Sequence, residues 1–281
     1  MHDDPAAGAP AAGSRPVADG PDPAARARAV PDAEPRGPDS AAPGTHAGTA
    51  LAASVPPVGS SRSADRRFAD RRAAGRALGK RLAGDTPGDP IVLGLPRGGV
   101  VVAAEVATVL AAPLDVLVVR KLGLPGRPEL AMGAIAAVGN AVRTVRVDSV
   151  LTAAAIDVPV LEEVRQREIG ELRRREAAYR GDRPAAALEG RDVVLVDDGL
   201  ATGATMHVAV VAVRCGHPAS VTVAVPVGSP RACATIGLLV DRIVCLSIPT
   251  DFRAVGQAYD DFTQTSDDDV RTALEAAGRR A

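Results

Sequence analysis

Short apolar runs alternate with longer segments of helical periodicity from about residue 61 onward. Five runs rich in Val, Ile and Leu predict buried strands at 91–95, 114–119, 193–196, 221–225 and 242–247. Four segments with apolar residues on one helical face predict helices at 100–110, 160–179, 204–214 and 230–239. Strands that alternate with helices form βαβ units, so the pattern predicts an α/β fold with a mostly parallel sheet flanked by helices.

One segment departs from this alternation. Residues 134–138 and 142–147 are two apolar stretches separated by Gly139-Asn140, a dipeptide that favours tight turns between antiparallel strands. The glycines and cations between Lys121 and Val147 also suit a segment that moves when an anion arrives. We therefore predict a hairpin flap that acts as a lid and carries Lys121 toward a bound anion.

The first 60 residues have a different composition from the rest. They consist mostly of Ala, Pro, Gly, Asp and Arg, and no apolar face persists for more than a few residues. Such a segment cannot bury enough apolar surface to offset its chain entropy, so it predicts a disordered tail over 1–60. The predicted domain spans 61–281 and opens with a helix from a cap near Ser63 to about Leu82, with Phe68 on its apolar face.

Composition narrows the class of partner. The chain has 281 residues and a formal net charge of -1, so nothing in its overall charge favours a nucleic acid. An arginine run between Arg62 and Arg76 is interleaved with acids and lacks aromatic residues, which favours a solvated helix face. The three cysteines form no CxxC pair and fit buried free thiols. No run of about 18 apolar residues and no secretory signal is present, so we expect a cytoplasmic protein without a membrane partner.

The most informative stretch is VVLVDDGLATGATM, which begins at Val193. Four apolar strand residues end in Asp197 and Asp198, and a short loop rich in Gly and Thr then opens a helix. In open α/β sheets, ligands bind beyond the carboxyl ends of the strands, where this loop must lie. The free amides of the helix N-terminus and the hydroxyls of Thr202 and Thr205 favour a phosphate, and Gly203 allows close approach. The stretch predicts a phosphate-binding cup.

The two acids exclude the usual nucleoside triphosphate loop. That loop needs a lysine before its last hydroxyl residue, and residues 197–206 contain no lysine. Carboxylates are acceptors only, so Asp197 and Asp198 repel a polyphosphate but suit the two hydroxyl donors of a sugar diol. A diol site just before a phosphate cup predicts a ribose 5-phosphate group.

The stretch resembles the diphosphoribose-binding signature of type I phosphoribosyltransferases. The resemblance implies that Asp197 and Asp198 contact the ribose hydroxyls of 5-phosphoribosyl 1-diphosphate (PRPP). It also implies that these acids hold Mg²⁺, directly or through ribose hydroxyls or water. The 5-phosphate would be wrapped by the loop residues Ala201, Thr202, Gly203, Ala204 and Thr205. The chain departs from the usual pattern at Gly199, where a large apolar residue is common, and at Ala204, where Gly is frequent.

Two further segments are similar to the same family. Leu95 to Gly99 resembles its pyrophosphate loop, in which Arg97, Gly98 and Gly99 would hold the diphosphate. Residues 118–133 are similar to its mobile catalytic loop, especially in adenine-type members, and would supply Lys121. The catalytic residues implied are Lys121, Asp197, Asp198 and Arg97.

The expected function is transfer of phosphoribose to a small-molecule acceptor, a nitrogenous base, with release of pyrophosphate. Ala201 stands where hypoxanthine/guanine-type members carry a carboxylate, which disfavours that acceptor class. Two alternatives remain open: a non-catalytic binder of PRPP or a nucleotide, and an enzyme that hydrolyses or transfers a phosphoryl group. A homo-oligomer also remains open. The aromatic residues of segment 251–262 either line a base-binding hood or pack in the core beside a C-terminal helix.

Overall fold

The computed structural model describes residues 27–30, 67–85, 88–139 and 141–279. The predicted tail lies outside these ranges except for β1 (Ala27–Val30), whose backbone pairs antiparallel with β6 (Ala141–Val147). The sequence analysis predicted no strand at this position. The structure therefore adds one short pairing to the part of the chain that precedes the domain.

The centre of the molecule is a five-stranded parallel sheet with the order β3-β2-β7-β8-β9. All five predicted strands are present, and their bounds are β2 Pro90–Gly94, β3 Leu114–Val116, β7 Asp192–Val196, β8 Ser220–Val227 and β9 Arg242–Ser247. The strands are mostly apolar because helices cover both faces of the sheet. The mostly parallel α/β fold predicted from the sequence is confirmed.

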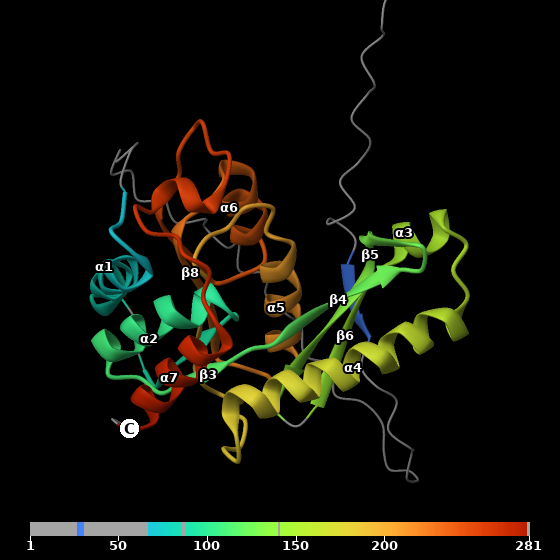
Figure 1. Cartoon of the computed structure of the whole chain (residues 1–281), viewed down its shortest axis with the longest axis horizontal. Coiled ribbons are helices and arrows are strands. Elements are labelled where there is room, and N and C mark those ends of the chain that lie inside the picture. The colour runs from blue at the N-terminus through green and yellow to red at the C-terminus, as the bar shows by residue number, and fades with distance from the viewer. Residues whose placement is uncertain (1–26, 31–66, 86–87, 140, 280–281) are drawn as a thin grey trace, which may run out of the picture.

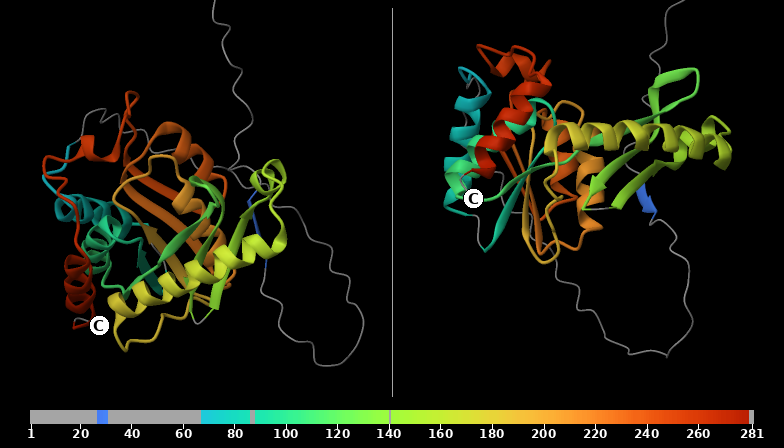
Figure 2. Two further views of the ribbon diagram at one scale, coloured as in Figure 1. Left: turned by 45° about the vertical axis from the view of Figure 1, so that its right-hand side comes forward. Right: turned by 60° about the horizontal axis from the view of Figure 1, so that its bottom comes forward.

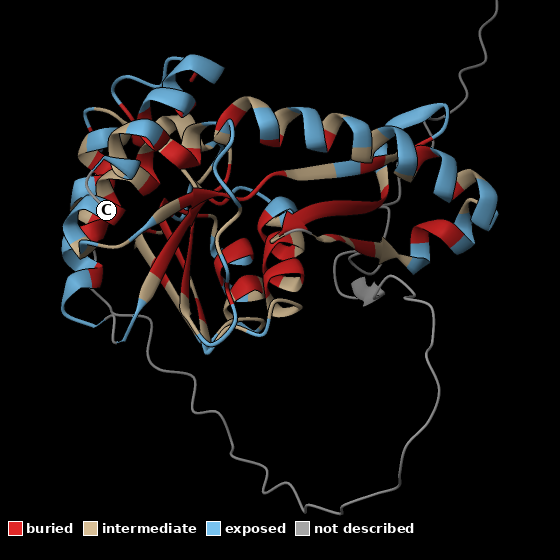
Figure 3. Ribbon diagram, turned by 90° about the horizontal axis from the view of Figure 1, so that it is seen from below, coloured by how far each residue is buried: buried red, intermediate tan, exposed pale blue. Residues whose placement is uncertain are grey.

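Successive strand residues point to opposite faces of the parallel sheet and enter two separate core clusters. Val92 and Val194 pack with α1 (Arg71–Ala83) and α2 (Gly98–Leu110) on one face. Leu93 and Leu195 pack with α5 (Ala204–Arg214) and α6 (Pro230–Gly237) on the other. Figure 1 shows α1 and α2 on one side of the strands and α5 on the other, and Figure 3 shows that the helices expose only their outer faces.

A second sheet extends from the first. It is antiparallel, has the order β1-β6-β5-β4, and contains β4 (Val119–Leu124) and β5 (Arg127–Val138). One face is covered by α4 (Val158–Arg180), which Figure 2 shows running along the strands, and α3 (Asp148–Ala153) follows β6. Alternate residues of β5 pack with α5 on the opposite face. The predicted hairpin is confirmed as β5 and β6, although β5 begins earlier than expected.

The predicted strand at 114–119 is wrong in one respect, because it is split between the two sheets. β3 ends at Val116, Leu117 and Val118 form a buried connection, and β4 begins at Val119 in the antiparallel sheet. Leu117 still donates its amide to Gly94 O at 3.0 Å, so the chain leaves the parallel sheet only after this bond. A continuous apolar run carries no signal for such a change of partner.

The first helix begins later than the sequence predicted. Asp70 is the N-cap of α1 and accepts a hydrogen bond from Ala73 N at 2.6 Å. Phe68 therefore lies before the helix, where its amide donates to Ala258 O at 2.8 Å and its ring faces Tyr259. The competing cap residue Ser63 lies outside the described residues. The Asp70 side chain, bonded to the third helical amide, sets the start of the helix.

The C-terminal part contains a short 3-10 helix η2 (Val255–Ala258) and α7 (Asp267–Gly278). The sequence analysis gave α7 no bounds, although Ser266 and Asp269 form a capping box that marks its start. Its buried residues Val270 and Leu274 join the core cluster that contains α4. In the described part of the chain, no helix has both the length and the apolar character that a bilayer span requires.

Candidate functional site

The loops after β2 and β7 meet at the point where the strand order reverses. From β2 the chain crosses to β3 on one side, whereas β7, β8 and β9 follow one another on the other side. Leu95 N, just after β2, donates to Val196 O at the end of β7 at 2.9 Å. Such a switch point at the carboxyl edge is where open α/β sheets bind ligands. The predicted diphosphate and diol segments therefore occupy the favoured place in the fold.

Glycines bring the first turn of α2, which directly follows the loop after β2, into contact with the loop after β7. A Cβ atom on Gly98 would lie only 1.9 Å from Asp198 Oδ2, and one on Gly99 would lie 2.8 Å from Asp197 Cα. No side chain larger than hydrogen fits at Gly98 without displacing the carboxylate. Gly98, Gly99, Asp197 and Asp198 thus form one continuous surface, as expected if the diphosphate and ribose of one ligand lie side by side.

The loop from Ala201 to Thr205 leaves the N-terminus of α5 open. Gly203 precedes the helix with φ +80°, a left-handed conformation that favours glycine, and it has no side chain to cap the helix. The first intrahelical bond runs from His207 N to Gly203 O, so the amides before it have no helical partner. Ala201, Thr202, Ala204 and Thr205 are exposed. Exposed amides at a positive helix end suit a phosphate.

The base of this loop is held in place from below. Leu200 is buried and donates its amide to Val227 O at 2.9 Å. Ser229, the N-cap of α6, donates its hydroxyl to Ala201 O at 2.7 Å. The cup is therefore fixed at its start by β8 and α6, while its exposed part faces outward.

The two acids differ in their surroundings. Asp197 Oδ1 accepts a hydrogen bond from Asp198 N at 2.8 Å, and burial, followed by the charge of Asp198, raises the pKa of Asp197 well above its usual value. Asp198 Oδ2 forms a 2.8 Å ion pair with Arg71 Nε, and its carbonyl accepts from Tyr259 Oη at 2.6 Å. The anionic form of Asp197 is thus destabilised, whereas Asp198 is paired with the Arg71 guanidinium.

Arg71 is a site residue that the sequence analysis treated only as part of a solvated arginine run. It is the first residue of α1, and it also donates to Thr263 O at 2.8 Å. Its guanidinium carbon lies 3.9 Å from the ring centroid of Phe262. Arg71 and Asp198 are 127 positions apart, so only the fold brings them together. The other arginines of the run that the structure describes have acidic partners as well: Arg67 pairs with Asp260, and Arg72 and Arg76 pair with Glu105.

The aromatic residues of segment 251–262 pack largely against each other. Tyr259 is only 2% exposed, its ring stacks on Phe262 with centroids 5.0 Å apart, and Phe68 lies on the same cluster. Burial and the charge of Asp198 raise the pKa of Tyr259. Phe262 keeps 38% of its surface exposed. Core packing therefore accounts for Tyr259, and Phe262 is the ring that reaches the surface beside Arg71.

Arg97 and Lys121 are placed differently from each other. Arg97 follows a cis peptide bond, precedes the first residue of α2, and lies 3.9 Å from an Asp267 oxygen. Lys121 lies in β4 opposite Ala134, where its Nζ is 3.3 Å from Glu129 O and 3.6 Å from the Glu129 carboxylate. Arg97 therefore lies directly before Gly98 and Gly99, whereas Lys121 lies in β4 of the antiparallel sheet.

The segment predicted as a glycine-rich lid is a regular sheet. Residues 119–124 and 127–138 pair across most of their length, with an irregularity at Gly123. Arg120 forms an ion pair with Glu168 of α4 at 2.5 Å, and Lys121 pairs with Glu129. Both cations therefore have acidic partners in the protein itself, and the predicted lid movement stays a prediction. The tip between β4 and β5 and the start of β5, residues 125–130, are exposed.

The acid pair is compatible with magnesium only if a ligand supplies further oxygens. Within the described residues, no three or more His, Cys, Asp or Glu side chains form a cluster able to hold a metal ion. Mg²⁺ in phosphate-handling sites often uses one or two carboxylates, several waters and substrate oxygens. Asp197 and Asp198 match that pattern at the mouth of the cup.

The comparisons with known proteins agree with this geometry. The model of the phosphoribosyl transferase domain family matches residues 70–261. The chain belongs to this family. The matched range contains the parallel sheet, Gly98, Gly99 and the acid pair.

Individual relatives support the family membership. Two Mycobacterium tuberculosis proteins, from strains CDC 1551 and H37Rv and each named "Putative phosphoribosyl transferase", are 48% identical over 212 residues. The match covers 75% of this chain and 47% of each relative, so the chain spans about half the length of the curated relatives it matches. The crystal structure of TT1426 from Thermus thermophilus is 46% identical, with a TM-score of 0.64, and covers 74% of this chain and 97% of that chain.

Proposed function

We propose that this phosphoribosyl transferase domain binds PRPP with Mg²⁺ and transfers the phosphoribosyl group to a nitrogenous base, releasing pyrophosphate. The observation that carries the proposal is that three features of the protein, each suited to one group of PRPP, lie together at one switch point. These are the open N-terminus of α5, the acid pair, and the glycine loop that touches both acids. Together they match the phosphate, the diol and the diphosphate of PRPP in spatial order.

The roles of the residues follow from their chemistry. The amides of Ala201 to Thr205 and the hydroxyls of Thr202 and Thr205 would bind the 5-phosphate. Asp197 and Asp198 would accept hydrogen bonds from the ribose hydroxyls. The backbone of Gly98 and Gly99 and the side chain of Arg97 would hold the diphosphate. This arrangement orients the anomeric carbon between the diphosphate and the acceptor.

Breaking the bond between the anomeric carbon and the diphosphate builds positive charge on the ribose and negative charge on the leaving group. The carboxylates of Asp197 and Asp198 favour the first charge, and the Arg97 guanidinium favours the second. Magnesium, when bound at Asp197 and Asp198 through substrate oxygens or water, would add charge neutralisation on the diphosphate. Most of the work assigned to this chain is therefore positioning and electrostatic stabilisation.

The acceptor is proposed only as a class. Ala201 carries no carboxylate, so this loop cannot supply an acid or base to a purine acceptor. Phe262 supplies an exposed aromatic surface beside Arg71, on which a planar base can stack. We therefore propose a planar nitrogenous acceptor in the context of nucleotide metabolism, without a carboxylate partner at residue 201.

The deciding experiment measures pyrophosphate release from PRPP and magnesium, with and without a pool of bases. Release that requires one of the bases supports the transferase. Binding of PRPP by calorimetry without release would favour the non-catalytic binder. Release that needs no base would instead indicate a hydrolase.

A further inference from the structure

Arg71 lies between the loop assigned to the diphosphate and the acid assigned to the ribose. A Cβ atom on Gly98 would lie 2.8 Å from Arg71 Nε and 1.9 Å from Asp198 Oδ2, so the backbone of Gly98 touches both groups. The same nitrogen and oxygen are 2.8 Å apart. Cation, carboxylate and glycine loop thus meet at a single point of the site.

The ion pair engages one oxygen of the carboxylate that is assigned to a ribose hydroxyl. The side chains of Arg71 and Asp198 are only 11% and 18% exposed, so water screens their attraction less than at the surface. Asp198 Oδ2 is held by Arg71, while Asp197 Oδ1 is held by the amide of Asp198. A ribose diol therefore gains the full acceptor capacity of both acids once Arg71 releases Asp198 Oδ2.

The surroundings of Arg71 allow such a movement. Its guanidinium is supported by the ring of Phe262 and by the Thr263 carbonyl, and neither contact depends on Asp198. Arg71 also lines a cavity of about 180 Å³, together with residues that include Val101, Gln264 and Thr265. The side chain therefore has a second set of partners and space beside it.

We infer that Arg71 exchanges partners when the substrate binds. Its guanidinium releases Asp198 and binds the diphosphate of PRPP, which frees Asp198 for the ribose. The inference rests on the proposed function, because it takes PRPP as the ligand. Arginine donates five N–H groups in a planar fork and forms short, charge-assisted, often bidentate bonds to phosphates. A diphosphate carries more negative charge than a single carboxylate, so the new partner is the stronger one.

Two ligands separate this exchange from a structural role of Arg71. PRPP carries the diphosphate, whereas ribose 5-phosphate has the same phosphate and hydroxyls but no diphosphate. We expect Arg71→Ala to weaken magnesium-dependent PRPP binding at least tenfold by calorimetry. The same variant should bind ribose 5-phosphate as well as the wild type or more tightly, because Asp198 is already free.

Matched variants make the result decisive. Arg72→Ala removes the neighbouring arginine, which pairs with Glu105, and should leave both affinities unchanged. Arg71→Lys keeps the charge without the fork, so PRPP affinity should fall by less than in Arg71→Ala; this variant replaces Arg71→Ala if the latter does not fold. Equal weakening of both ligands by Arg71→Ala, or no weakening of PRPP, overturns the exchange. A wild type that binds neither ligand refutes the proposed function itself, and the inference with it.

Discussion

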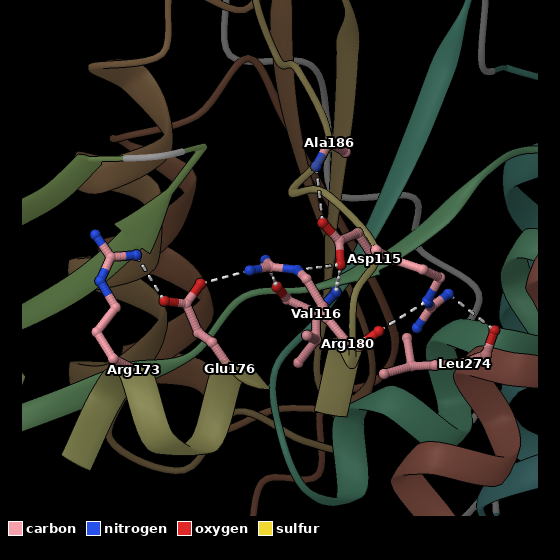
Figure 4. A network of polar contacts seen from close by, with 8 residues as sticks. Asp115, Val116, Arg173, Glu176, Arg180, Ala186 and Leu274 are labelled. Carbon is pink, nitrogen blue, oxygen red and sulfur yellow. Dashed lines mark hydrogen bonds and ion pairs between the residues drawn. The ribbon is translucent and has the colours of Figure 1, made fainter. Parts of the chain in front are cut away.

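Asp115 Oδ1 and Arg180 Nε form a 2.8 Å ion pair that joins the parallel sheet to the last turn of α4. Arg180 also donates to Val116 O at 2.7 Å and bonds to Glu176, while the second oxygen of Asp115 accepts from Ala186 N at 3.0 Å (Figure 4). Both side chains are almost fully buried. This network holds α4, and the antiparallel sheet beneath it, against the strands that carry the site.

Arg180→Ala should destabilise the domain strongly. Removing Arg180 leaves the carboxylate of Asp115 buried without its cation and leaves Glu176 with Arg173 alone, and breaking such a buried pair typically costs about 3–5 kcal/mol. Urea unfolding followed by circular dichroism measures the change in free energy. Arg174→Ala is the matched control, because Arg174 pairs with Glu171 on the exposed face of α4 and its loss should change stability little. Equal effects of the two variants would contradict the role given to the network.

Asp197→Asn should stabilise the domain at neutral pH. The pKa of Asp197 is raised in the folded state, so the stability that it contributes is present below its unfolded pKa and is lost as pH rises through the folded pKa. Asn keeps an oxygen for the amide of Asp198 and cannot ionise. Thermal melts should show the variant above the wild type at about pH 8, with the difference vanishing near about pH 3. Asp198→Asn, which loses the Arg71 ion pair, should not gain stability.

The sequence predicted the parts of the site that are local in the chain. The strand from Val193, the acids that end it and the helix from Ala204 are contiguous, so periodicity and loop chemistry suffice to place them. The helix Ala204–Arg214 has the bounds that were predicted. Gly98 and Gly99 were placed after the correct strand, but they were predicted in a loop and are instead the first two residues of α2, which begins two residues earlier than expected.

The parts that the sequence could not predict depend on distant partners. In the sequence, Arg71 is one arginine of a charged run, and no residue near it in the chain indicates that Asp198 and Phe262 are its neighbours. The strand 114–119 changes sheets after Val116 because of pairing with Gly94 and then with β5, which an apolar run does not encode. The partners of Lys121 likewise follow from the β4–β5 pairing.

Gly98→Ala should abolish PRPP binding, because the added methyl group must displace the Asp198 carboxylate or the Arg71 guanidinium. We expect at least a tenfold loss of affinity by calorimetry, together with a lower melting temperature. Gly170→Ala is the contrasting variant, since Gly170 is in the interior of α4 with no atom within 4 Å of the added Cβ. That substitution should stabilise the domain by about 0.5–1 kcal/mol and leave binding unchanged. Intact binding by Gly98→Ala would exclude the assigned contact between the two loops.

Substitution of Lys121 tests whether the tip of the antiparallel sheet takes part in the reaction. Its ion pair with Glu129 is long, at 3.6 Å, and Glu129 is almost fully exposed, so Lys121 can leave this partner at small cost. If Lys121 meets the charge that grows on the leaving diphosphate, Lys121→Ala should lower the rate of pyrophosphate release far more than PRPP affinity. Glu129→Gln frees the same lysine and should not lower the rate.

Limited proteolysis gives a second, independent test of that movement. Arg127 lies at the exposed start of β5, next to Gly126 with φ +75°, so cleavage there reports on the tip between β4 and β5. PRPP and magnesium should slow this cleavage in the wild type and slow it less in Lys121→Ala, because the lysine would tie the tip to the diphosphate. Suppose instead that Lys121→Ala lowers affinity and rate equally and that the ligand gives no protection. The tip would then be a fixed part of the sheet, and catalysis would rest on the loops after β2 and β7 alone.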